Sequence, residues 1–66
     1  MLSKFKPGDL IQVIDDEDII EGARVGDTGF IIKRIGCFRS NEKHFYDVYI
    51  FSYGFITLEE SEMIKL

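Results

Sequence analysis

Apolar residues along this chain fall into short runs separated by glycines, acids and other turn residues, a pattern typical of an all-β domain. The first run follows Pro7-Gly8, where proline presets φ and glycine can adopt the positive φ of a type II turn. Residues 9–14 then predict a first strand, which ends at the acids beyond it. We expect Ile11 and Val13 to face the core.

The second run, residues 28–35, is rich in β-branched and aromatic residues and predicts a second strand. Gly29 within it indicates either a β-bulge or a close approach of two backbones. Three consecutive apolar residues at 30–32 leave the inward face of this strand open, because a bulge would reset the alternation. Residues 15–27, between the two strands, predict a long acidic surface loop with room for a helical turn at 16–20.

Residues 36–43 are rich in small and polar residues, and we interpret them as the connection of a long hairpin that leads into a third strand at 44–51. Asp47 is expected to face water, and the period of two then separates an inner from an outer set of side chains. The inner, core set is Tyr46, Val48 and Ile50, and the outer set is Phe45, Tyr49 and Phe51.

The remaining residues predict a second hairpin and a last strand. Residues 52–54 form a tight reversal in which Gly54 can take a positive φ, and residues 55–58 form a fourth strand. Residues 59–61 are too short and too acidic for a strand and predict one turn of 3₁₀ helix. Residues 62–66 then complete the sheet as a fifth strand.

This order of elements resembles the SH3-like small β-barrel family, in the branch that contains KOW and Tudor-like modules. The resemblance implies one domain over residues 1–66, folded as a five-stranded barrel with a 3₁₀ turn before the last strand. Similar small members include the variable subunit of ferredoxin-thioredoxin reductase and the peripheral subunit IV of photosystem I, both non-catalytic accessories of larger complexes, and short phage-encoded barrels. The resemblance is carried by Pro7, Gly8, Asp9, Ile11, Val13, Gly26, Asp27, Thr28, Gly29, Ile31, Ile32, Tyr46, Asp47, Val48, Ile50, Leu58, Ser61, Glu62 and Ile64.

Composition narrows the picture further. A domain of about this size buries only roughly 60% of its unfolded surface, and the single cysteine excludes an intrachain disulfide, so stability depends on a dense core or on association. The formal charge of −4 disfavours nucleic acid as a partner. The chain has neither the apolar run of a signal peptide nor a membrane-spanning stretch of roughly 20 apolar residues, so we expect a soluble, cytoplasmic protein.

Candidate chemistry is sparse. The candidates for nucleophilic catalysis are Cys37 and His44, which have no second histidine or evident oxyanion donor beside them, so we expect no enzyme activity. One cysteine and one histidine do not make the four ligands of structural zinc. The acidic loop departs from a calcium loop that would start at Asp16, because Ile20 falls where an oxygen ligand belongs. We therefore expect no metal and no cofactor.

Two binding hypotheses remain. In the first, the outer aromatic set, with other aromatics nearby, docks a protein partner or a second copy of the chain, because exposed apolar patches indicate association. The chain would then be a non-catalytic accessory or assembly module. The open alternative is that the acidic loop or Phe5 folds over the set and completes the core. The candidate protein-binding residues are Phe45, Tyr49, Phe51, Phe38 and Tyr53.

In the second hypothesis, basic residues on the long hairpin grip phosphate in the manner of KOW modules, with Phe38 or Phe45 stacking on a base. Four basic groups predict binding that weakens with salt. The same charges would also suit an acidic protein. The candidate phosphate-binding residues are Lys33, Arg34, Arg39 and Lys43, with His44 beside them.

Overall fold

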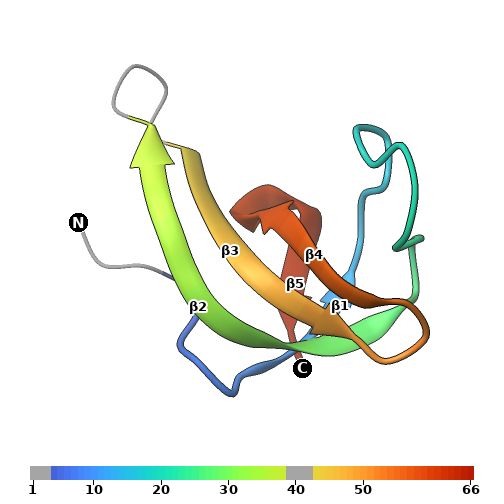
Figure 1. The fold of residues 1–66 in the computed structure, drawn as a ribbon, viewed down its shortest axis with the longest axis horizontal. Coiled ribbons are helices and arrows are strands. Elements are labelled where there is room, and N and C mark those ends of the chain that lie inside the picture. The colour runs from blue at the N-terminus through green and yellow to red at the C-terminus, as the bar shows by residue number, and fades with distance from the viewer. Residues whose placement is uncertain (1–3, 39–42) are drawn as a thin grey trace.

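A computed structural model describes residues 4–38 and 43–66 of the chain. Five antiparallel strands form one sheet with the order β4-β3-β2-β1-β5 (Figure 1). A single 3₁₀ turn, η1, lies between the last two strands, which confirms an all-β fold. The elements are β1 Leu10–Val13, β2 Thr28–Phe38, β3 Lys43–Ile50, β4 Gly54–Glu59, η1 Glu60–Glu62 and β5 Met63–Lys65.

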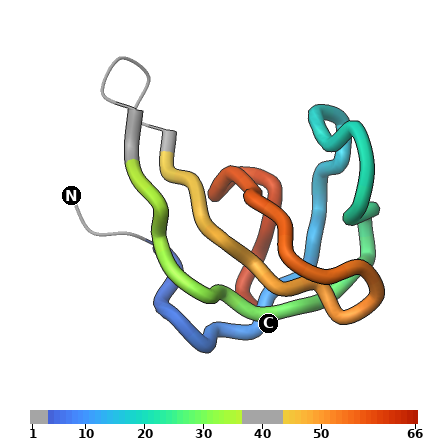
Figure 2. Tube along the Cα trace, viewed as in Figure 1, coloured from blue at the N-terminus to red at the C-terminus, as the bar shows by residue number. Residues whose placement is uncertain are grey.

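The long strand β2 joins the two halves of the sheet. Its first residues pair with β1, from Gln12 opposite Thr28 to Leu10 opposite Phe30, and nearly its whole length pairs with β3. Figures 1 and 2 show that β2 and β3 are strongly curved. The order leaves β4 and β5 at the two edges, so the sheet of the described residues is open.

The core lies on the inner side of this bend and contains the side chains expected there. Ile11 and Val13 of β1 are fully buried, and so is the whole inner set of β3, which confirms both predictions. In β2 the open question is settled, because Ile31 is buried while its neighbours are only partly so. The buried apolar residues are Phe5, Ile11, Val13, Ala23, Ile31, Tyr46, Val48, Ile50, Leu58 and Met63.

Phe5 completes this core from the inside. Its ring meets that of Tyr46 edge-on, with the two centroids 5.4 Å apart. Since Tyr46 belongs to the inner set, Phe5 does not lie over the outer aromatic set. Ile19 of the acidic loop also packs against the core. Both contacts lie on the inner side of the sheet.

At Gly29 the backbones of β2 and β3 leave no room for a side chain. A Cβ atom at this position would overlap the carbonyl oxygen and carbon of Tyr49 and the Cα of Ile50. This confirms the close backbone approach, while the irregularities of β2 lie further along the strand. The register shifts fall between Ile31 and Lys33 and between Arg34 and Gly36.

The turns are close to those expected, with three differences. The connection expected at 36–43 is shorter at both ends, because β2 extends to Phe38 and β3 already begins at Lys43. Gly8 and Gly54 have φ values of 91° and 123°, as their turns require. The 3₁₀ turn starts one residue later than predicted, because Glu59 acts as its N-cap and forms a capping box with Glu62. The helical turn at 16–20 is absent; a simple turn closed by the Ile19 amide on the Asp16 carbonyl takes its place.

In the part of the chain that the structure describes, no helix has the length and the apolar character to span a membrane. The helix found there, η1, has three residues.

Candidate docking face and acidic groove

The outer face of the sheet carries a cluster of aromatic rings centred on Tyr49. Strand register places Tyr49 between Phe30 of β2 and Phe55 of β4. The ring centroid of Tyr49 lies 5.6 Å from that of Phe30 and 5.1 Å from that of Phe55. Phe51, just beyond β3, lies 6.0 Å from Phe30 and 6.2 Å from Tyr49. We call these four residues the aromatic face.

The aromatic face belongs to a row that continues across the sheet. Leu10 of β1 pairs with Phe30, and the amide of Leu66, just past β5, donates a 2.9 Å hydrogen bond to the Leu10 carbonyl. Exposure is high along the row: 74% at Phe55, 51% at Leu10 and 62% at Leu66, with 56% at Phe51 beside it. Single exposed apolar residues are ordinary, but a contiguous apolar patch on a small protein indicates an interaction surface.

Sequence reasoning found half of this cluster. Tyr49 and Phe51 lie in it, whereas Phe30 and Phe55 were not predicted as site residues. Phe45 lies on the same side of β3 but at the strand's other end, opposite Glu59. Tyr53 is turned to the acidic loop, where its ring lies against Gly22. The side chain of Phe38 is outside the described part of the structure.

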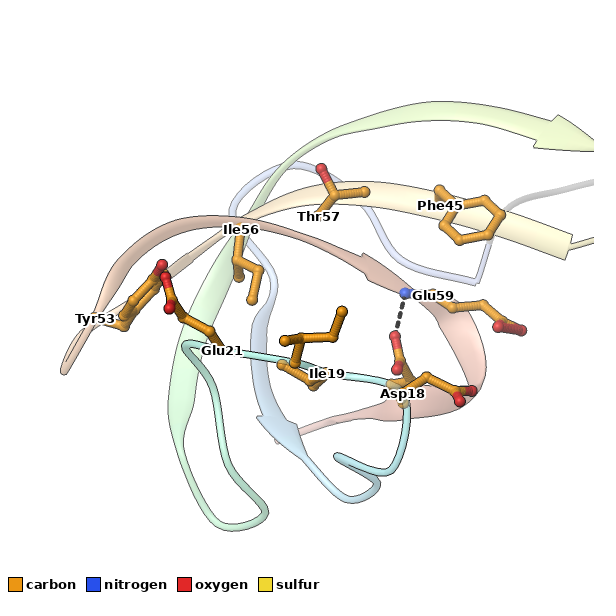
Figure 3. Close-up of a pocket in the computed structure, with 10 residues that line it drawn as sticks. Asp18, Ile19, Glu21, Phe45, Tyr53, Ile56, Thr57 and Glu59 are labelled. Atoms are coloured by element: carbon orange, nitrogen blue, oxygen red, sulfur yellow. Dashed lines mark hydrogen bonds between the residues drawn. The ribbon is translucent and has the colours of Figure 1, made fainter.

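A groove of about 550 Å³ runs between β4 and the acidic loop. Figure 3 shows Ile19 of the loop and Ile56 of β4 directed toward each other, with Tyr53 at one end. Both isoleucines also pack against the core, so the floor of the groove is apolar. The lining residues are Asp18, Ile19, Ile20, Glu21, Phe45, Tyr53, Ile56, Thr57, Glu59 and Glu62.

The rim of the groove is acidic. Among the lining residues that the structure describes, four are carboxylates, Asp18, Glu21, Glu59 and Glu62, and none is Lys or Arg. Burial raises the pKa of Glu62, and the nearby charges of Glu59, Asp18 and Asp15 add to the rise. The Glu59 amide opposes it by donating a 2.7 Å hydrogen bond to the Glu62 carboxylate. Glu62 is thus held in place by the Glu59 amide and lies close to other carboxylates.

A second carboxylate ties η1 to the core. The buried Tyr46 hydroxyl donates a 2.6 Å hydrogen bond to Glu60. The pKa of Tyr46 is raised, mainly by burial and to a smaller extent by this bond. The same oxygen of Glu60 accepts the Lys4 amide at 3.2 Å. Glu60 therefore links β3, η1 and the segment before β1, a structural role.

The hairpin cations are only partly described. Lys33 and Arg34 are exposed, and Lys33 stands opposite Asp47 on β3. Arg39 and the side chain of Lys43 lie outside the described residues. His44 is buried, so its imidazole does not belong to the exposed surface of the hairpin.

The register also brings Cys37 opposite His44, although the Cys37 side chain is not described. Within residues 4–36 and 44–66, no three His, Cys, Asp or Glu side chains come together as a metal-binding group. Comparison with known proteins finds no match among protein-family models, curated proteins or solved structures.

Proposed function

We propose that this chain is a non-catalytic accessory module that docks a protein partner through its aromatic face. The single observation that carries the proposal is the exposed apolar row, which crosses the sheet from Phe55 to Leu66. Aromatic residues are enriched among the anchors of protein interfaces, because each buries a large area at a small cost in side-chain entropy.

The central strands of the sheet support this row of apolar side chains. Phe30 and Tyr49 are half-buried and lie in the two central strands, whereas Phe55 and Phe51 project from β4 and from the turn before it. Cross-strand neighbours fix the rings before a partner arrives, which reduces the entropy that binding must remove. Leu10 and Leu66 extend the apolar surface toward β5.

The proposal includes an SH3-like fold class and a cytoplasmic location. The fold class is supported by five strands in one bent sheet, with a 3₁₀ turn before the last strand. The location is supported by the single cysteine in the sequence.

Nucleic-acid binding by the hairpin is the alternative, and its support is weaker. Of the candidate cations whose side chains are described, Lys33 and Arg34, the first is paired across the strands with an acid. The net charge of −4 also repels phosphate at long range.

Affinity capture from a lysate of the producing cells tests the proposal, with nuclease-treated and untreated samples compared. The baits are the wild-type chain and the Phe51→Asp variant; aspartate suits the turn in which Phe51 lies. A Val25→Asp variant is the matched control, since Val25 is similarly exposed but is not part of the row. We expect one nuclease-resistant protein to be retained by wild type and by Val25→Asp and lost by folded Phe51→Asp.

Two results would overturn the proposal. Unfolding of the Phe51→Asp variant would place Phe51 in the stabilising core and remove it from the interface. Recovery of many nucleic-acid binders that nuclease abolishes would instead favour the hairpin. Sedimentation equilibrium of the wild-type chain identifies the remaining case, in which the partner is a second copy.

A further inference from the structure

The outer edge of β4 presents backbone groups that no other strand of the described sheet uses. β4 is an edge strand, paired with β3 alone. In an antiparallel pair, alternate residues direct both their N–H and C=O groups to the same neighbour. The Glu59 amide bonds the Glu62 carboxylate rather than β3. Thr57 and Phe55, two and four residues before it, therefore direct their amides and carbonyls to the open edge.

The turn between β3 and β4 independently shows that the backbone groups of Phe55 and Thr57 face the open edge. The Phe51 amide donates to the Thr28 carbonyl of β2, at 3.0 Å. Odd-numbered residues of β3 consequently bond β2, and even-numbered residues bond β4. Val48 pairs with Ile56, so Ile56 faces β3 and its neighbours Phe55 and Thr57 face outward.

The acidic groove runs along this open edge. Thr57 lines it, and the acidic loop forms its far wall (Figure 3). Natural proteins usually cover or block exposed strand edges, because an open edge pairs with any extended chain. Here the apolar floor at Ile19 and Ile56 remains accessible, and carboxylates mark both walls.

We propose that the groove binds an extended peptide segment bearing lysine or arginine, which adds to the sheet as a strand beside β4. Main-chain bonds to Thr57 and Phe55 would supply register, Ile19 and Ile56 would receive an apolar side chain, and Asp18 and Glu21 would meet the basic ones. A second copy of this chain fits poorly, because two β4 edges would bring their acidic rims together. This proposal concerns a different surface from the aromatic face and does not depend on it.

The test uses a synthetic peptide of alternating lysine and valine, blocked at both ends and about eight residues long to match a typical strand. Binding is followed by amide hydrogen exchange of the whole chain. The Phe55 and Thr57 amides should exchange quickly in the free protein and at least about tenfold more slowly with saturating peptide, because each gains an acceptor. The Ile56 and Leu58 amides, already bonded within the sheet, serve as internal controls. A glutamate-valine peptide should not bind.

Two kinds of variant separate the backbone from the charges. Thr57→Pro removes one outward amide and should weaken the lysine peptide by at least about tenfold, since proline is tolerated on an edge strand when its nitrogen faces solvent. If that variant does not fold, the pair Asp18→Lys and Glu21→Lys decides, with Glu17→Lys as the control, because Glu17 lies in the same loop outside the groove. Phe51→Asp should leave peptide binding unchanged.

Absence of binding at about 1 mM peptide would overturn the inference, since such weak affinity would leave the groove without a useful ligand. Equal binding of the acidic peptide, or loss of lysine-peptide binding in folded Phe51→Asp, would do the same. So would a dimer that protects the Phe55 and Thr57 amides without peptide.

Discussion

Gly29 is the residue at which the fold depends most directly on the lack of a side chain. A methyl group there would overlap the Tyr49 carbonyl, and both atoms belong to central strands that cannot easily move apart. We predict that Gly29→Ala lowers the free energy of unfolding by about 3 kcal/mol. Chemical denaturation measures the change.

Gly36→Ala is the control, since a Cβ at Gly36 meets nothing within 4 Å, and it should leave stability unchanged or slightly higher. Equal effects of the two substitutions would contradict the close approach.

The Tyr46 hydroxyl is a second single-residue determinant. Tyr46→Phe removes its hydrogen bond to Glu60 and leaves a half-buried carboxylate with one fewer donor. We expect a loss of about 1.5–3 kcal/mol in unfolding free energy, the range for bonds to charged groups. Tyr49→Phe makes the same chemical change at a half-exposed position and should cost less than about 0.5 kcal/mol. If the two variants were equally stable, Glu60 would not tie η1 to β3.

At the scale of elements, the junction of β4, η1 and β5 predicts a pH dependence. The pKa of Glu62 is raised in the folded chain, chiefly by burial, so the folded state favours the neutral acid. Its contribution to stability is therefore complete below the unfolded pKa, near 4.5, and is lost as the pH rises through the folded pKa. Glu62→Gln keeps an acceptor for the Glu59 amide and removes the titration.

The measurement is the unfolding free energy of wild type and of Glu62→Gln across the acidic range up to neutral pH. The wild-type value should fall relative to the variant as the pH increases through this window. A difference that stays constant, or that changes in the opposite direction, would show that the Glu62 carboxylate is not desolvated at the end of β4.

The strands also show how far the sequence predicts this structure. Alternation assigned both faces of β3 correctly because the inner residues of that strand recur without interruption. It left β2 undecided because two register shifts interrupt the alternation there. Phe30 and Phe55 were missed since their contact with Tyr49 depends on strand pairing, which no local pattern contains. Phe45 lies on the same side of β3 as Tyr49, as expected, but four residues along a strand span roughly 13 Å, too far for ring contact.

The acidic groove was beyond sequence reasoning for a similar reason. The block of acids at 15–21 is evident in the sequence, but Glu59 and Glu62 join it only after the chain folds back. Burial of Glu62, which the sequence predicts as the first residue of the fifth strand, likewise depends on tertiary packing.

At the scale of the whole molecule, the chain combines a fully buried apolar core with an exposed apolar row on the opposite side of the same sheet. The core stabilises the fold without the row, so exposed aromatic residues can be replaced at little cost in stability. Retaining them in a small, acidic chain is consistent with a surface that becomes buried in a complex.

The affinity of the purified partner for the wild-type chain and for the double variant Phe51→Asp and Phe55→Thr tests this account most directly. Circular dichroism of the same samples confirms that the variant is folded. Each ring is expected to contribute at least about 1.4 kcal/mol, so the account predicts a loss of about 100-fold or more. A folded double variant that binds with unchanged affinity would show that the aromatic face is not the docking surface.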